Sequence, residues 1–138
     1  MDNCVFCKII KGEIPAEKVY EDENFLAFLD IKPVSTGHLL LIPKEHYPTF
    51  LEMPEEIIQK IMTRAKHLMG AIKMATAADF VILSVVGIEI PHFHIHLIPR
   101  HKNDGLANFW PTKKYSNNEA KIIAEKIREN LNLYGNNS

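Results

Sequence analysis

Three histidines alternate with apolar residues in the segment "PHFHIHLIPR" (residues 91–100), although the whole chain holds only seven. If this segment is a strand, His92, His94 and His96 share one face, because successive side chains point to opposite sides. A neutral imidazole is available near pH 7 and attacks phosphorus or carbonyl centres when its other ring nitrogen is held by an acceptor. Neighbouring histidines can stabilise charge on phosphate oxygens or protonate a leaving group. The row therefore predicts nucleophilic or acid–base chemistry.

A zinc-dependent hydrolase is a second interpretation of the same row. A rise of about 3.3 Å per residue would place His92 and His96 ~13 Å apart along a strand. Zinc–nitrogen bonds are only about 2 Å long, so one ion cannot easily take all three rings. Two neighbours could share an ion whose bound water performs hydrolysis. In either case the row must divide into parts with separate roles.

The bulk properties indicate an ordinary globular protein. We predict one domain over residues 1–138, because the chain is long enough to bury a core. The net charge of -1 argues against nucleic acid or an anionic membrane as the main partner. The first residues are not a basic-then-apolar leader, and the apolar runs are too short to span a bilayer. We therefore expect a cytoplasmic protein.

Hydrophobic periodicity predicts an α+β domain with an antiparallel sheet. A long helix begins at Pro54 and carries one apolar stripe, so it should lie on the sheet. Ser116 and Glu119 form a capping box for a last helix through about Leu131. The remaining predicted elements are a short helix over residues 4–13 and strands over residues 19–21, 25–29, 38–42, 80–86 and 90–98. The last two strands should pair as a hairpin.

Two separated blocks of the sequence resemble one known family. "HFHIHLIPR" resembles the His-x-His-x-His signature of the histidine triad (HIT) family of nucleotide hydrolases and transferases. "CVFCKIIKGEIPAEKVYEDENFLAFLDIKPVSTGHLLLIPKEHY" is similar to the N-terminal half of that family. The resemblance implies a HIT-like α+β fold with a five-stranded antiparallel sheet, one long helix, an N-terminal helix and a C-terminal helix. It also implies a homodimer whose sheets join.

The resemblance implies a covalent mechanism without a catalytic cofactor. His94 would attack the α-phosphorus of a nucleotide and form a nucleotidyl-histidine that water hydrolyses. His96 would hydrogen-bond a phosphate oxygen, and His38, in "TGHLLLIP", would support the triad from the neighbouring strand. The expected activity is a phosphoramidase or nucleotidyl hydrolase acting on purine nucleotides of the AMP type. A dinucleoside polyphosphate hydrolase and a nucleotide-binding module with vestigial activity are alternatives.

A nucleotide pocket is implied by the same resemblance. Four apolar residues would sandwich the base and one carboxylate would accept hydrogen bonds from the ribose hydroxyls. These residues are Phe6, Ile9, Phe28 and Ile31 for the base, and Asp30 for the ribose. The alternative for the four apolar residues is ordinary core packing. The alternative for Asp30 is a capping or turn role at the end of a strand.

The pair Cys4-x-x-Cys7 has the spacing of zinc ligands, but two cysteines are half a site. The resemblance to bacterial HIT members supplies His46 and His92 as the other two ligands of a structural zinc. The alternative is a pair of inert thiols, with His46 capping a turn.

The sequence departs from the family pattern just before the histidine row. Family members commonly carry Gly-Gln-x-Val there, whereas this chain has Gly87-Ile88-Glu89-Ile90. Glu89 could act on an amine leaving group or face solvent. The aromatic pair Phe109–Trp110 is expected to pack on the domain, or to cover a substrate or dimer edge.

Overall fold

The computed structural model of the chain describes residues 3–106 and 111–137. The chain divides into two units, Met1–Asp104 and Gly105–Ser138, each of which is described by itself. The single domain over residues 1–138 stays a prediction. Phe109 and Trp110 lie outside the described residues, so the expectation for them stays open.

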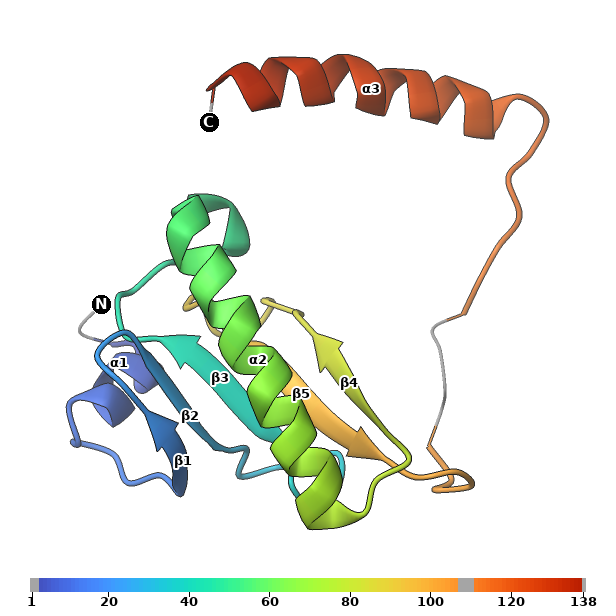
Figure 1. The fold of residues 1–138 in the computed structure, drawn as a ribbon. Coiled ribbons are helices and arrows are strands. Elements are labelled where there is room, and N and C mark those ends of the chain that lie inside the picture. The colour runs from blue at the N-terminus through green and yellow to red at the C-terminus, as the bar shows by residue number, and fades with distance from the viewer. Residues whose placement is uncertain (1–2, 107–110, 138) are drawn as a thin grey trace. The chain divides into compact units, whose positions relative to one another are not determined.

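The first unit is built on a five-stranded antiparallel sheet in the order β1-β2-β3-β5-β4 (Figure 1). The strands are β1 (Lys18–Glu21), β2 (Phe25–Leu29), β3 (Leu39–Pro43), β4 (Phe80–Ser84) and β5 (Ile95–Arg100). The predicted fold class is confirmed, with its five-stranded sheet, long helix, N-terminal helix and C-terminal helix. The predicted hairpin is also present, because β4 pairs antiparallel with β5.

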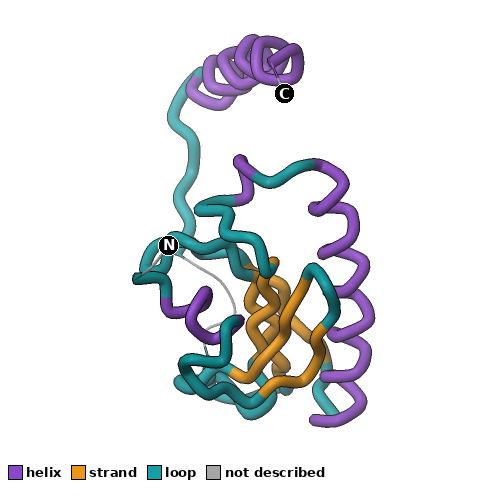
Figure 2. The backbone as a smooth tube through the Cα atoms, turned by 90° about the vertical axis from the view of Figure 1, so that its left-hand side faces the viewer, coloured by secondary structure: helices purple, strands orange, loops and turns teal. Residues whose placement is uncertain are grey.

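Side chains of the central strands alternate between two apolar layers, as strand geometry requires. Phe25, Ala27, Leu39 and Leu41 face a core that includes the long helix α2 (Glu55–Thr76). Their neighbours in sequence face a second cluster, to which the short helix α1 (Val5–Ile10) contributes; these neighbours are Leu26, Phe28, Leu40 and Ile42. Figure 2 shows α1 and α2 on opposite sides of the strands.

Helix α2 follows a 3-10 turn, η1 (Phe50–Glu52), and has Pro54 as its N-cap rather than as its first residue. Glu55 and Glu56 lie in the first turn, where carboxylates favour a helix start. The predicted apolar stripe is buried at Ile61, Ala65, Leu68 and Ile72. Met62, the apolar residue next to Ile61, is 40% exposed and lies outside the buried part of the stripe.

Strand β5 begins at Ile95, five residues later than predicted. Pro91 has no N–H to offer a neighbouring strand, and the His92 N–H donates to the Ile90 carbonyl at 2.9 Å in a tight turn. The Phe93 N–H donates to the Tyr47 carbonyl instead of to the sheet. His92 and His94 therefore precede the strand. The predicted alternation still holds, because Phe93, Ile95 and Leu97 lie in the core that includes α2, whereas His92 and His94 contact Phe6 and His96 pairs with Leu40 of the opposite cluster.

The second unit contains helix α3 (Glu119–Asn137), which extends beyond the predicted end near Leu131. The Ser116 N–H donates to Glu119 Oε1 at 3.2 Å, which is one half of the predicted capping box. None of the helices in the described parts of the chain has the length and apolarity needed to cross a membrane.

Gly37 precedes β3 at a tightly packed end of the sheet, and a substitution there tests this packing. Its φ is +101°, and an added Cβ would lie 2.8 Å from Thr76 Cγ2 and 3.4 Å from Pro99 Cγ. We predict that Gly37→Ala lowers the free energy of unfolding by about 2 kcal/mol or more, measured by urea denaturation.

Gly70→Ala is the matched control, because nothing lies within 4 Å of a Cβ added at Gly70 in α2. This variant should gain up to about 1 kcal/mol through helix propensity. A Gly37→Ala protein as stable as the wild type would contradict the tight contact.

Candidate functional site

One row of residues crosses the sheet in register. Phe28 of β2 pairs with Leu40 of β3, Leu40 pairs with His96 of β5, and His96 pairs with Ser84 of β4. Neighbouring strands are about 4.8 Å apart, so the row places the Phe28 side chain roughly 10 Å from His96. Phe28, Leu40 and His96 line the same cavity. The sheet therefore sets the separation between the predicted base pocket and the predicted phosphate site.

A chain of hydrogen bonds determines the tautomers of two of the predicted triad residues. The Val34 N–H donates to His38 Nδ1 at 3.0 Å, so this nitrogen is unprotonated and Nε2 carries the hydrogen. His38 Nε2 lies 2.9 Å from His96 Nδ1, which must then be the acceptor. His96 consequently carries its hydrogen on Nε2. The pair of buried His38 and half-buried His96 thus presents an N–H donor on His96.

His94 has the complementary arrangement. Its Nδ1 lies 2.7 Å from the His92 carbonyl oxygen, and a carbonyl can only accept, so Nδ1 carries the hydrogen. Nε2 is therefore the ring nitrogen with a lone pair. The ring is 7% exposed, and its centroid lies 5.1 Å from that of His96 in an edge-on arrangement. The arrangement places a ring nitrogen that has a lone pair beside an N–H donor.

Both rings line a cavity of about 620 Å³. This volume is in the range of small-molecule sites, which are about 300 to 1,000 Å³. All five residues of the predicted nucleotide pocket line it as well; they are Phe6, Ile9, Phe28, Asp30 and Ile31. His38 is not among the lining residues and lies behind His96 through their hydrogen bond. The structure therefore brings together every predicted residue of the catalytic and nucleotide sets.

Asp30 makes the turn contact considered for it, and its place at the cavity leaves the ribose-binding role a prediction. Its Oδ1 accepts a hydrogen bond from the Lys32 N–H at 2.9 Å, which is a local turn contact. Its Oδ2 lies 3.6 Å from His38 Nε2. The turn contact uses one carboxylate oxygen, and the other remains near the histidines at the cavity.

Sequence reasoning missed part of the lining. Ile14, Pro15 and Ala16 close the cavity next to α1, and the loop over residues 86–90 closes another side. It also missed the Val34 N–H, because a backbone donor leaves no signature in residue type. The difference between Gly87-Ile88-Glu89-Ile90 and the family pattern drew attention to this loop, but it did not predict that the loop lines the cavity.

Cys4, Cys7, His46 and His92 gather at a second cluster, with ligand atoms that all lie within 4.8 Å of one another. Cys4 is the N-cap of α1 and its sulfur accepts from the Cys7 N–H, so the first turn of the helix positions both thiols. His92 Nε2 donates to the Pro43 carbonyl at 2.9 Å, which leaves the Nδ1 lone pair facing the other three groups.

The spacing within this cluster fits one tetrahedral zinc ion. His46 Nδ1 and His92 Nδ1 are 3.1 Å apart, and each lies 3.3 Å from one cysteine sulfur. Ligand atoms on one zinc are about 3.3 to 3.8 Å apart, because zinc bonds are about 2.0 to 2.3 Å long. Burial lowers the pKa of His92, which favours the neutral ligand form. Two thiols and two imidazoles are a closed structural set.

Phe6 joins this cluster to the candidate catalytic site. The residue lies between the two cysteines in α1, and its ring contacts His92 and His94 with centroid distances of 5.7 and 5.0 Å. It also meets the Phe28 ring edge-on at 5.7 Å. Any ion that holds α1 in place would therefore also hold one wall of the cavity.

Asp30, His38 and His96 form another group close enough to hold a metal. Both nitrogens of His38 already take part in hydrogen bonds, with the Val34 N–H and with His96. An ion could use His38 only after one of these bonds breaks. The hydrogen bonds therefore favour a donor role for this pair over the zinc-dependent hydrolase.

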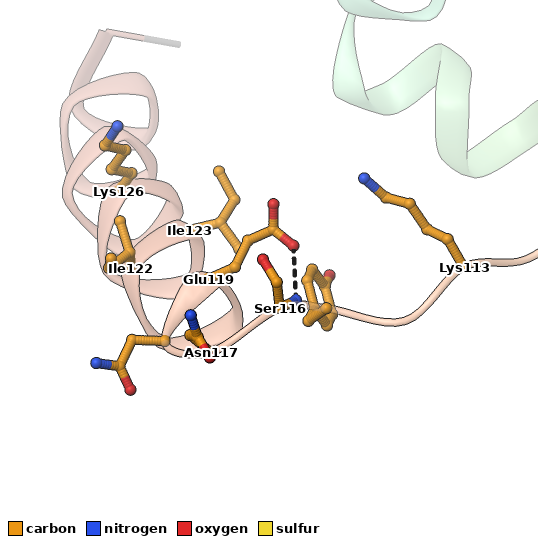
Figure 3. Close-up of a pocket in the computed structure, with 9 residues that line it drawn as sticks. Lys113, Ser116, Asn117, Glu119, Ile122, Ile123 and Lys126 are labelled. Atoms are coloured by element: carbon orange, nitrogen blue, oxygen red, sulfur yellow. Dashed lines mark hydrogen bonds between the residues drawn. The ribbon is translucent and has the colours of Figure 1, made fainter.

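A further cavity of about 600 Å³ lies in the second unit at the start of α3 (Figure 3). Its labelled lining residues include Lys113, Lys126, Ile122 and Ile123, all of which are exposed. Glu119 accepts the Ser116 N–H there, which is the capping bond described above. The described contacts give this cavity only a capping bond, whereas the histidine cavity contains an imidazole nitrogen with a lone pair beside an imidazole N–H donor.

An antiparallel α+β fold that presents hydrogen-bonded histidines to a ligand-sized cavity defines the class of this protein. The family model for the HIT domain matches residues 11–103, which is more than half of the chain. The chain therefore belongs to the HIT domain family.

Relatives and solved structures agree with this assignment. An adenosine 5'-monophosphoramidase from Saccharomyces cerevisiae is 40% identical over 116 residues, covering 80% of this chain and 72% of that protein. A crystal structure from Streptococcus mutans has a TM-score of 0.87 and 36% identity, and covers 95% of this chain and 87% of that chain. A zinc-bound histidine triad family protein from Mycobacterium smegmatis has a TM-score of 0.73 and 32% identity, covering 81% and 85%.

Burial lowers the pKa of both His38 and His96 from the ordinary value of 6.5, and the neighbouring His94 and His38 lower that of His96 further. We predict that both rings stay neutral as the pH falls below 6.5. The folded protein then binds these protons less tightly than the unfolded chain does. Their contribution to stability is therefore complete above pH 6.5 and is lost as the pH falls through the lowered pKa values.

Imidazole nitrogen chemical shifts across a pH titration measure both the tautomers and the midpoints. His38 should carry its proton on Nε2 at neutral pH. A proton on Nδ1 of His38, or midpoints above 6.5, would contradict the hydrogen-bond chain.

Proposed function

We propose that this chain is a nucleotide phosphoramidase or nucleotidyl hydrolase that acts through a nucleotidyl intermediate on His94. The observation that carries the proposal is the His94 ring, whose Nδ1–H is held by the His92 carbonyl at 2.7 Å while the ring lines the cavity. A ring held in this tautomer has its Nε2 lone pair available for attack on phosphorus. The relative from Saccharomyces cerevisiae, an adenosine 5'-monophosphoramidase, supports the choice of substrate class.

The reaction proceeds in two displacements. His94 Nε2 attacks the α-phosphorus, the bond to the leaving nitrogen or oxygen breaks, and the leaving atom takes the electron pair and a proton from solvent, which the hydrolytic water of the second step returns. Water then attacks the phosphorus of the nucleotidyl-His94, which releases the nucleoside monophosphate and restores the ring. His96 donates its Nε2–H to a phosphate oxygen and stabilises the charge that develops there. His38 positions His96 through their 2.9 Å hydrogen bond.

The nucleoside occupies the side of the cavity formed by α1 and the end of β2. Phe6, Ile9 and Phe28 are buried and offer one apolar surface for a purine base. Ile31 is 90% exposed, so a base resting against it would cover apolar surface that now faces water. Asp30 Oδ2 accepts hydrogen bonds from the ribose hydroxyls. We propose an AMP-type nucleotide as the substrate.

Two alternatives begin from the same pocket. A dinucleoside polyphosphate hydrolase would use the same first step with a nucleotide as the leaving group. A nucleotide-binding module with vestigial activity would bind AMP without turnover. The unbroken hydrogen-bond chain from Val34 to His96 favours turnover, because a binding module has no need of a defined donor tautomer.

We predict that His94→Ala lowers kcat with an adenosine phosphoramidate by at least about 10³-fold, because the covalent step loses its nucleophile. Circular dichroism and urea denaturation check that the variant is folded. His67→Ala is the matched control, since His67 lies exposed on α2.

Wild-type protein quenched in mild alkali during turnover should carry adenylyl on the peptide containing His94, as measured by mass spectrometry. Full activity of His94→Ala, or adenylyl on a different residue, would overturn the proposed mechanism.

We infer further that Cys4, Cys7, His46 and His92 would hold a structural zinc ion. Its chemistry would be to cross-link α1 to the end of β3 and to the turn before β5. The ligand spacing and the zinc-bound relative from Mycobacterium smegmatis support this inference. No step of the proposed reaction passes through the metal.

We predict about one zinc per chain in the purified protein, measured by plasma mass spectrometry, and loss of that zinc in Cys7→Ser. The variant should lose more than about 3 kcal/mol of unfolding free energy, because metal binding is coupled to folding. Binding of AMP, measured by calorimetry, should weaken in parallel since Phe6 and Ile9 lie on the released helix. An equally stable, metal-free Cys7→Ser protein would contradict the structural role.

The homodimer implied by the family stays a prediction. Within the described sheet β4 is an outer strand, with Phe80 43% exposed. An outer strand offers unpaired backbone groups to a second copy, which supports joining of two sheets there.

A further inference from the structure

The loop over residues 86–90 lies beside the proposed reaction centre. It leaves the sheet after Ser84, which is paired with His96, and the chain returns through His94 to β5. Both ends of this loop therefore lie next to His94 and His96 at the cavity. Residues 86–90 all line that cavity.

This loop forms the part of the cavity lining that is not assigned to nucleoside binding. The proposed base-binding and ribose-binding residues come from α1 and from the end of β2, at the opposite end of the row that crosses the sheet. Once a nucleoside fills that side and its phosphate reaches His94 and His96, the group released from phosphorus has the loop as its remaining neighbour.

The loop combines apolar side chains with one carboxylate. Val86 and Ile88 are 54% and 83% exposed, and Ile90 packs on the apolar cluster beneath. Glu89 is exposed and lines the cavity, and among the described residues it has no hydrogen-bond or ion-pair partner. The cavity's other charged side chains, Asp30 and Lys32, lie at the nucleoside side and nearly balance each other.

We propose that Glu89 determines leaving-group specificity by favouring amines that carry a second, positive charge. The inference rests on the proposed function and deepens it. A leaving group with an alkyl chain can lie along Val86 and Ile88, and its remote ammonium can approach the Glu89 carboxylate. A leaving group that bears a carboxylate, phosphate or sulfate meets the same charge with repulsion.

The chemistry of the step is unchanged by this selection. His94 Nε2 forms the new bond to phosphorus, the P–N bond breaks, and the amine nitrogen departs with the electron pair and takes a proton from solvent. Glu89 exchanges no proton and forms no bond. It acts only through the difference in charge between leaving groups, so it is a specificity residue rather than a catalytic one.

Three adenosine phosphoramidates that share one P–N bond type provide the test. Their leaving amines are putrescine, butylamine and γ-aminobutyrate, whose far ends are cationic, neutral and anionic. For the wild-type protein we expect kcat/KM to fall in that order, with putrescine preferred over γ-aminobutyrate by about tenfold or more. The preference should shrink as the salt concentration rises.

Glu89→Gln should bring the three values of kcat/KM to within about twofold, and Glu89→Lys should reverse their order. The butylamine compound should be hydrolysed at a similar rate by the wild type and by Glu89→Gln, since its leaving group has no remote charge. Glu23→Gln is the matched control, because Glu23 lies exposed in the turn between β1 and β2, and it should keep the wild-type order.

The failures of the two proposals are distinguishable. Hydrolysis of all three compounds with an order that Glu89→Gln leaves unchanged would overturn the role of Glu89 and leave the proposed function standing. Absence of wild-type turnover with every compound would overturn the proposed function, and this inference with it.

Discussion

The hydrogen bond from His94 Nδ1 to the His92 carbonyl is the constraint on which the candidate site depends. It decides which nitrogen of His94 keeps a lone pair, and the contacts of His92 hold the accepting carbonyl in place. The His92 ring is fully buried, is tied to the Pro43 carbonyl through Nε2, and faces the cysteine cluster through Nδ1. One residue therefore serves both sites: its backbone orients the proposed nucleophile and its ring joins the proposed metal ligands.

Hydrogen bonds that begin at a backbone group also set the tautomers of His38 and His96. A backbone amide at Val34 sets the tautomer of His38, and His38 in turn sets that of His96. Burial keeps both rings neutral at physiological pH, because a charged imidazole would be poorly solvated there. A neutral relay of this kind offers a donor to phosphate without placing a permanent charge beside the nucleophile.

The cavity has two sides with different physical character. Helix α1 and the end of β2 form an apolar wall with one carboxylate, suited to a base and a ribose. The loop over residues 86–90 forms a smaller wall with a single exposed acid. The register of β2, β3, β5 and β4 holds these two walls at opposite ends of one row, so a change in the loop can alter the leaving group while the nucleoside side keeps its shape.

Much of this organisation could be predicted from the residues alone. The periodicity of residues 25–29 and of the long helix is local information, and both elements lie where predicted. The Cys4-x-x-Cys7 spacing and the histidine row named the reactive groups because residue type determines what a side chain can do chemically. The spacing of the three histidines also indicated that they have separate roles, since three rings spread along a strand cannot bind one ion.

Other features were decided only by the tertiary structure. The late start of β5 depends on Tyr47, a residue distant in sequence that takes the Phe93 N–H from the sheet. The tautomers depend on backbone groups of Val34 and His92, and a backbone donor or acceptor is present at almost every position, so no residue type marks it. The place of Glu89 at the cavity follows from the pairing of Ser84 with His96. Residue types state which chemistry is available, whereas long-range pairing sets the distances at which it acts.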